Sequence, residues 1–131
     1  RLLRRAAELG VADRVEILGR IEDERLIELY ARALAVHYAP FDEDYGYVTV
    51  EAFKSGRAVL TSSDSGGVLE FVRDGENGFV TDPDSPRELA LRIDRLAADR
   101  ELARALGRRG QLAVAGISWD AVVPRLLSPL R

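Results

Sequence analysis

Two continuous apolar runs of strand length constrain the fold of this chain most. They are Leu34–Ala39 and Ala58–Thr61. Continuous rather than alternating apolar residues are typical of strands that are buried on both faces, as in a parallel sheet. Each run leads through a polar loop into a segment with a helical pattern, the first of which is Tyr47–Ser55. This alternation predicts right-handed βαβ units, and therefore a Rossmann-like α/β domain with helices on both faces of a parallel sheet.

Turn and capping signals divide the rest of the chain into short elements. Two further strands are expected, at Arg14–Gly19 and Phe79–Val80. Helices are expected at Leu2–Leu9, after an Asp23 N-cap, through Leu69 to Val72, after the capping box Ser85–Glu88, over roughly Glu101–Ala115 and from Ser118 onward. No repeat or linker interrupts residues 1–131, so we expect a single domain, or a part of one.

The composition excludes several kinds of chemistry. The 131 residues include no Cys and one His, which excludes disulfides, a cysteine nucleophile and a His/Cys zinc site. The chain also has no Met, so Arg1 does not follow a start methionine and we expect a piece of a longer protein. No apolar run is long enough for a signal peptide or a membrane span, and we expect a cytoplasmic protein.

Charge is balanced and mixed along the chain. The 19 basic and 22 acidic residues give a net charge of −3 without a basic stripe. A nucleic-acid partner is therefore not expected. The Arg-rich stretch Arg100–Arg109 is interpreted as a solvated helix face, or second as an interdomain contact.

The first loop after an apolar run carries the best candidate residues for binding a ligand. In parallel sheets, ligands bind in the loops that follow the carboxyl ends of the strands. Glu43 lies in this loop, and Glu51 lies about one turn inside the next helix. A carboxylate suits the vicinal hydroxyls of a ribose or hexose. The free amides of Gly46, Tyr47 and Val48 at the start of the helix favour an anion, typically a phosphate.

The second loop, Ser62–Gly67, is less specific. Its Gly66 and Gly67 precede a helix and let a backbone approach closely. For this loop alone, a tight strand-to-helix turn is favoured over a binding role.

The order and spacing of several motifs resemble one enzyme family. The motifs are Glu43-Asp44-Tyr45-Gly46 with Glu51, Gly56 before Val59, Asp64-Ser65-Gly66-Gly67 with Glu70, and Asp74-Gly75-Glu76-Asn77-Gly78. Together they resemble the donor-binding half of the two-domain (GT-B) retaining glycosyltransferases, specifically the family 4 group called glycosyl transferases group 1. The resemblance implies the C-terminal half of a GT-B fold whose first strand precedes Arg1.

The resemblance implies a role for each matching residue. Glu43 would lie by the donor sugar and the positive charge that develops at its anomeric carbon, and is the expected catalytic residue. Glu51 would hold the ribose hydroxyls of the nucleotide. The amides of Gly46, Tyr47 and Val48 would meet the sugar or the diphosphate.

Further expectations concern what surrounds these residues. Ser65, Gly66 and Gly67 would edge the pocket, whereas Asp44 stands where the family more often has Gly. The nucleotide-diphosphate sugar would be a substrate, with no cofactor and no metal. The partners implied are this donor and an N-terminal acceptor domain of the same enzyme. That domain would precede Arg1, and so would an Arg and a Lys that bind the donor diphosphate. This piece alone would then be inactive, because stabilising the leaving diphosphate is a major catalytic effect. Peripheral membrane association of the whole enzyme stays open.

Other interpretations remain open at this point. One is a non-catalytic sugar-nucleotide-binding module or pseudoenzyme, and another is a flavodoxin-like signalling or scaffold domain. The Asp42/Asp44 and Asp82/Asp84 pairs fit a metal-binding Asp-x-Asp pattern, but a turn is favoured for the second pair. His37 is interpreted as a core or strand-end histidine rather than a catalytic base.

Overall fold

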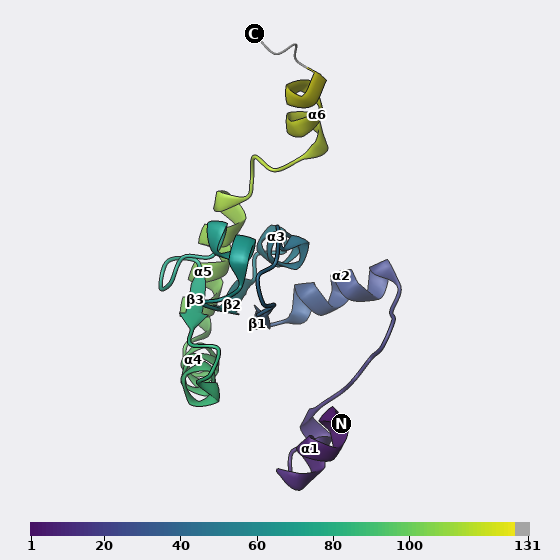
Figure 1. The fold of residues 1–131 in the computed structure, drawn as a ribbon, viewed down its shortest axis with the longest axis vertical. Helices are drawn as coiled ribbons and strands as arrows, with labels where there is room; N and C mark the ends of the chain where they lie inside the picture. The colour runs from purple at the N-terminus through teal and green to yellow at the C-terminus, as the bar shows by residue number, and fades with distance from the viewer. Residues whose placement is uncertain (128–131) are drawn as a thin grey trace.

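The computed structural model describes residues 1–127 and contains a parallel three-stranded sheet. Its strands are β1 (Ala35–His37), β2 (Ala58–Ser62) and β3 (Gly78–Thr81), in the order β1-β2-β3 (Figure 1). Both pairings are parallel, with Val36 beside Val59 and Leu60 beside Phe79. The predicted parallel sheet is therefore confirmed.

Helices connect the strands and extend the chain on both sides of the sheet. The α-helices are α1 (Leu2–Glu8), α2 (Asp23–Arg32), α3 (Tyr47–Lys54), α4 (Pro86–Ala98), α5 (Arg100–Ala113) and α6 (Trp119–Leu127), with 3-10 turns η1 (Ala12–Arg14) and η2 (Gly66–Glu70). No helix within residues 1–127 is long and apolar enough to cross a membrane. The helices expected from the sequence are present, most with bounds within about two residues, except the one expected through Leu69 to Val72. There the structure has only the 3-10 turn η2, which ends before Phe71.

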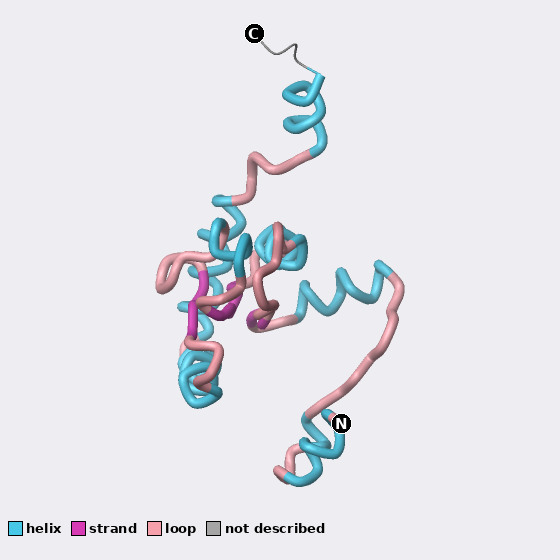
Figure 2. Tube along the Cα trace, in the orientation of Figure 1, coloured by secondary structure: helices cyan, strands magenta, loops and turns pink. Residues whose placement is uncertain are grey.

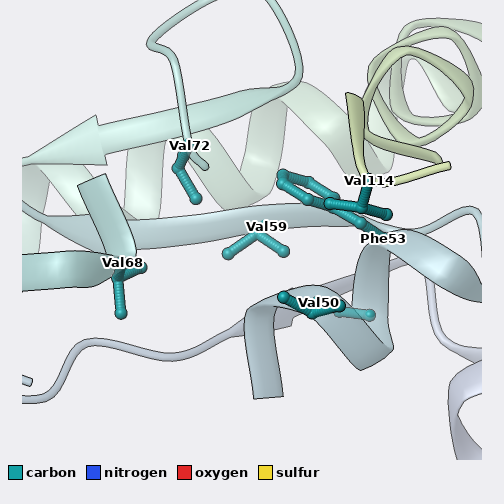
Figure 3. Close-up of a cluster of buried hydrophobic side chains, with 7 residues drawn as sticks. Val50, Phe53, Val59, Val68, Val72 and Val114 are labelled. Atoms are coloured by element: carbon teal, nitrogen blue, oxygen red, sulfur yellow. The ribbon is translucent and has the colours of Figure 1, made fainter. Parts of the chain in front are cut away.

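Successive residues of β2 bury their side chains on opposite faces of the sheet, as the pleat of a strand requires. Val59 packs in a cluster beneath α3, shown in Figure 3, whose members are Val50, Ala52, Phe53, Val59, Val68, Val72 and Val114. Ala58 and Leu60 pack in a second cluster with β3, α4 and α5, whose further members are Phe79, Leu96, Ala103 and Leu106. The prediction of helices on both faces is confirmed.

Helix α5 approaches the turn before β2 through a glycine. A Cβ atom at Gly107 would lie 2.0 Å from the Gly56 carbonyl oxygen, so no larger residue fits there without movement. Gly107 and its neighbour Leu106 are buried. This contact fixes the middle of α5 against the turn that precedes β2.

The capping predictions have mixed outcomes. The Ser85 hydroxyl accepts a hydrogen bond from the Glu88 amide, as the capping box predicts. Asp23, expected as an N-cap, is instead the first residue of α2, where Glu22 is the N-cap and provides no side-chain cap. A carboxylate in the first turn still interacts favourably with the helix dipole, which explains the misleading signal.

The strand expected at Arg14–Gly19 is wrong. Arg14 closes the turn η1, and the segment after it runs extended toward α2 (Figure 2). Within the described residues, no backbone hydrogen bond joins residues 16–19 to the sheet. Val15 and Ile17 are accordingly exposed. An apolar, β-prone sequence becomes a strand only where a neighbour satisfies its backbone groups.

Candidate functional site

The two loops at the carboxyl edge of the sheet are joined through their backbones. The Asp42 amide donates to the Asp64 carbonyl oxygen at 2.9 Å, and the Gly67 amide donates to the Glu43 carbonyl oxygen at 2.6 Å. A Cβ atom at Gly67 would lie 2.2 Å from the Asp44 carbonyl oxygen. The glycines therefore allow the second loop to approach the first closely. This contact fixes the backbone that carries Glu43.

The Glu43 carboxylate has two hydrogen-bond donors. The Tyr38 hydroxyl donates to Oε2 at 2.8 Å, and the Asp44 amide donates to Oε1 at 3.1 Å. The bond to Glu43, reinforced by burial and by the carboxylate's charge, raises the pKa of Tyr38. The tyrosine therefore stays protonated at neutral pH and holds the half-buried carboxylate in place.

Glu51 is held in a similar way from a different helix. The Tyr30 hydroxyl on α2 donates to Glu51 Oε2 at 3.0 Å. Burial, together with the bond to Glu51 and the charge of that carboxylate, raises the pKa of Tyr30 to about 12. Within residues 1–127, Glu51 Oε1 has no hydrogen-bond partner, and the residue is exposed. A carboxylate oxygen is thus available to accept bonds from a ligand.

The start of α3 lies between these two carboxylates in the sequence. Gly46 adopts φ +80° at the N-cap, a conformation that favours glycine. The Tyr47 and Val48 amides have no acceptor in the described part of the chain. Such amides and the helix dipole attract anions. The first turn of α3 therefore offers backbone donors, and the two held carboxylates on either side of it in the sequence offer acceptors.

Aromatic side chains line the same region. The Tyr45 ring lies 5.0 Å from the ring of Tyr47 and 5.1 Å from that of Phe71, centroid to centroid. Tyr47 remains 69% exposed, so most of its ring is open to a ligand.

The other candidates have roles within the fold. The Ser65 side chain is fully buried and bonds to the hydroxyls of Thr61 and Ser62, both at 2.9 Å. His37 lies exposed at the end of β1 rather than in a buried strand, and desolvation lowers its pKa. The Asp82 carboxylate accepts from the Asp84 amide at 2.8 Å in the turn before α4, as the turn interpretation predicts.

The described residues do not contain a cluster of side chains that would support metal binding. No group of three or more His, Cys, Asp or Glu side chains within residues 1–127 is arranged to hold a metal ion. The proposed binding roles of Glu43, Gly46, Tyr47, Val48, Glu51, Ser65, Gly66 and Gly67 stay predictions, since no bound molecule tests them.

Sequence reasoning missed both tyrosines that hold the carboxylates. Tyr38 ends the first apolar run five residues before Glu43, and this proximity was an available signal. Tyr30 lies 21 residues before Glu51, and nothing local in the sequence links the two.

Comparison with known proteins decides the family. The family described as "Glycosyl transferases group 1" matches residues 1–113. The chain belongs to this family. The match covers well over half of the chain and includes both loops and the helices from α1 to α5.

Individual relatives agree with this assignment to the group 1 glycosyltransferases. The chain is 36% identical over 126 residues to the D-inositol 3-phosphate glycosyltransferase of Nocardia farcinica, covering 96% of this chain and 28% of that protein. It superposes with a TM-score of 0.88 and 31% identity on sucrose-phosphate synthase from Thermosynechococcus elongatus. This superposition covers 96% of this chain and 32% of the synthase chain. For Anabaena Alr3699/HepE in complex with UDP-glucose, the TM-score is 0.85 and the identity is 30%. This superposition covers 98% of this chain and 36% of the Anabaena chain.

The fold matches the C-terminal domain of the two-domain GT-B enzymes, with fewer strands than is typical of that domain. The chain spans about a quarter to a third of the length of the three relatives. The expected family resemblance and fold class are both confirmed.

Proposed function

We propose that this chain is the donor-binding part of a retaining glycosyltransferase that takes a UDP-sugar. One observation carries the proposal: two carboxylates, each held by a tyrosine hydroxyl, accompany the free amides at the start of α3. Carboxylates accept bonds from sugar hydroxyls, and amides at a helix start receive phosphate. The Anabaena structure at 30% identity contains UDP-glucose, which supports a uracil nucleotide.

The roles follow from this arrangement. Glu51, with a carboxylate oxygen unoccupied, accepts bonds from the ribose hydroxyls. Glu43 accepts bonds from the sugar hydroxyls and stabilises positive charge at the anomeric carbon. The Tyr47 and Val48 amides donate to the diphosphate or the sugar, and the loop containing Gly66 and Gly67 holds the Glu43 backbone in position.

The whole enzyme then transfers the sugar to an acceptor with retained anomeric configuration. We propose that an N-terminal domain binds the acceptor, and that cationic groups outside this chain stabilise the leaving diphosphate. The first turn of α3 contains no cationic side chain. The chain by itself therefore binds donor weakly and does not turn it over. Family membership favours this function over a flavodoxin-like scaffold.

Calorimetric titration with UDP-, GDP- and ADP-glucose tests the proposal. We expect binding of the UDP-sugar with a Kd on the order of 1 mM. Glu51→Ala is expected to weaken it at least about tenfold, since a charged hydrogen-bond acceptor is lost. Glu24→Ala is the matched control, because Glu24 is an exposed glutamate on another helix, and it should bind like the unmodified chain.

Three results would contradict parts of the proposal. Equal binding of all three nucleotides would remove the assignment of UDP. Equal binding by the chain and by Glu51→Ala would remove the role of Glu51 in ribose recognition. Turnover of UDP-glucose by the chain alone would contradict its proposed inactivity.

A further inference from the structure

A second concave site lies at the opposite, amino edge of the sheet. Its cavity has a volume of about 260 Å³ and is lined by residues that precede β1 and β2 and by the first turns of α5. Four arginines surround it: Arg32, Arg57, Arg100 and Arg104. They come from three separate parts of the sequence, so the fold brings them together.

The Arg57 side chain is fixed by the backbone. It is half-buried, and its Nε donates to the Ser55 carbonyl oxygen at 3.2 Å while one terminal nitrogen donates to the Ala33 carbonyl oxygen at 3.1 Å. A guanidinium has more N–H donors than these two bonds use. Arg57 is therefore a preoriented cation with donors to spare in the wall of the cavity.

The wall formed by α5 is also fixed. Gly107 lies against the Gly56 carbonyl, so the turn that carries Arg57 and the helix that carries Arg100 and Arg104 cannot move apart freely. Ala103, which is buried, lines the cavity between the two arginines of this helix.

The charges around the cavity do not balance. Glu101 pairs with Arg104, and Asp99 caps the start of α5 by accepting from the Leu102 amide at 2.9 Å. Within residues 1–127, the side chains of Arg32 and Arg100 have no ion-pair or hydrogen-bond partner. The site therefore keeps an excess of positive charge in a chain whose net charge is −3.

We propose that this arginine site binds a compact phosphate-bearing anion, such as inorganic diphosphate or a phosphate monoester. Planar guanidinium groups match the oxygens of phosphate and bind them through paired hydrogen bonds. The cavity is smaller than the roughly 300–1,000 Å³ typical of pockets for drug-sized ligands, which suits a small anion. The site lies at the other end of the strands from Glu43 and the start of α3, and it does not depend on the proposed donor function.

An NMR titration of the ¹⁵N-labelled chain with inorganic diphosphate tests the proposal. We expect saturable shifts at the amides of Gly56, Arg57 and Arg100, with a Kd below about 1 mM at low ionic strength and weaker binding as salt is added. The double variant R100Q/R104Q should bind at least tenfold more weakly. It should remain folded, because both side chains are exposed.

Arg108→Gln is the matched control, since Arg108 is an exposed arginine of α5 that does not line the cavity. Its affinity should stay within twofold of the unmodified chain. The proposal is overturned by the absence of saturable shifts up to about 10 mM diphosphate, by equal binding in R100Q/R104Q, or by shifts confined to the Tyr47 and Val48 amides. Equal response to sulfate and diphosphate would identify an adventitious ion only.

Discussion

The two ends of the same three strands are built in opposite ways. At the carboxyl edge, two loops bond to each other, and the Tyr38 hydroxyl holds Glu43. At the amino edge, short turns and the start of α5 gather arginines around a cavity. The first edge presents fixed acceptors beside the free amides of α3, and the second presents fixed cations.

The difference shows what each edge depends on. The carboxyl edge depends on contacts between loops, through Gly67 and Glu43. The amino edge depends on a helix packed in the core, through Gly107 and Gly56. A change of the Gly67 contact should therefore have local effects, whereas a change of the Gly107 contact should affect the whole domain.

The largest expected effect comes from Gly107→Ala. The added Cβ must displace α5 from the Gly56 carbonyl, and such overpacking costs about 1–3 kcal/mol of unfolding free energy even though alanine favours the helix. Urea unfolding measures this loss, and amide shifts should change at both edges. Unchanged stability would show that α5 adapts and that the amino edge is not fixed.

Gly67→Ala is the matched change at the carboxyl edge. Its Cβ would meet the Asp44 carbonyl oxygen, so the two loops must separate. We expect a smaller loss of about 1–2 kcal/mol and amide shifts confined to residues 42–48 and 62–70. Shifts that reach Arg100 would break the distinction between the two edges.

The tyrosines should separate recognition of ribose from recognition of sugar. Tyr30→Phe removes the donor to Glu51 and should weaken UDP and UDP-glucose about equally, by roughly two- to tenfold. Tyr38→Phe removes a donor to Glu43 and should weaken UDP-glucose by a similar factor while sparing UDP. Calorimetry with both ligands measures, for each variant, the ratio of its Kd to that of the unmodified chain. If Tyr38→Phe weakens UDP as much as UDP-glucose, Glu43 does not act at the sugar.

High pH should release the Tyr30–Glu51 contact. The pKa of Tyr30 is raised from 10.0 to about 12, so the stability that it contributes is fully present below pH 10 and is lost as pH rises toward 12. Unfolding free energy measured across this range should fall more steeply for the unmodified chain than for Tyr30→Phe. Parallel curves would show that folding does not raise the pKa of Tyr30.

The smallest expected effect is at the amino edge. Glu101→Gln removes the carboxylate that pairs with Arg104, so the arginine becomes free to bind an anion. Diphosphate affinity should rise by about two- to threefold, as expected for an exposed ion pair. Titration by calorimetry or NMR measures the change. A fall in affinity would show that Glu101 orients Arg104 for binding.

The sequence predicts what depends on local pattern. The apolar runs around Val36 and Val59 indicated parallel strands, and the Ser85 capping box located the start of α4. The segment 14–19 had an equally good strand pattern, but pairing also requires a neighbouring strand, which the pattern cannot report.

The sites divide in the same way. Glu43, Glu51 and the start of α3 were visible because motif order and strand ends locate them. The Tyr30–Glu51 bond joins residues 21 positions apart, and the arginine cavity brings together Arg32 and Arg100, which are separated by about half of the chain. Such contacts exist only after packing. The prediction that Arg100–Arg109 carries a solvated helix face agrees with its exposed arginines, but the pattern cannot report the cavity beside that face.

One NMR titration tests the central claim, that the carboxyl edge binds the nucleotide sugar. UDP-glucose is added to the ¹⁵N-labelled chain, and the amides of Tyr47 and Val48 are followed beside those of Arg57 and Arg100. We expect saturable chemical-shift changes at the amides of Tyr47 and Val48, with a Kd on the order of 1 mM, and little change at those of Arg57 and Arg100. Shifts at the arginine cavity instead, or no shift at Tyr47 and Val48 up to about 20 mM, would contradict it.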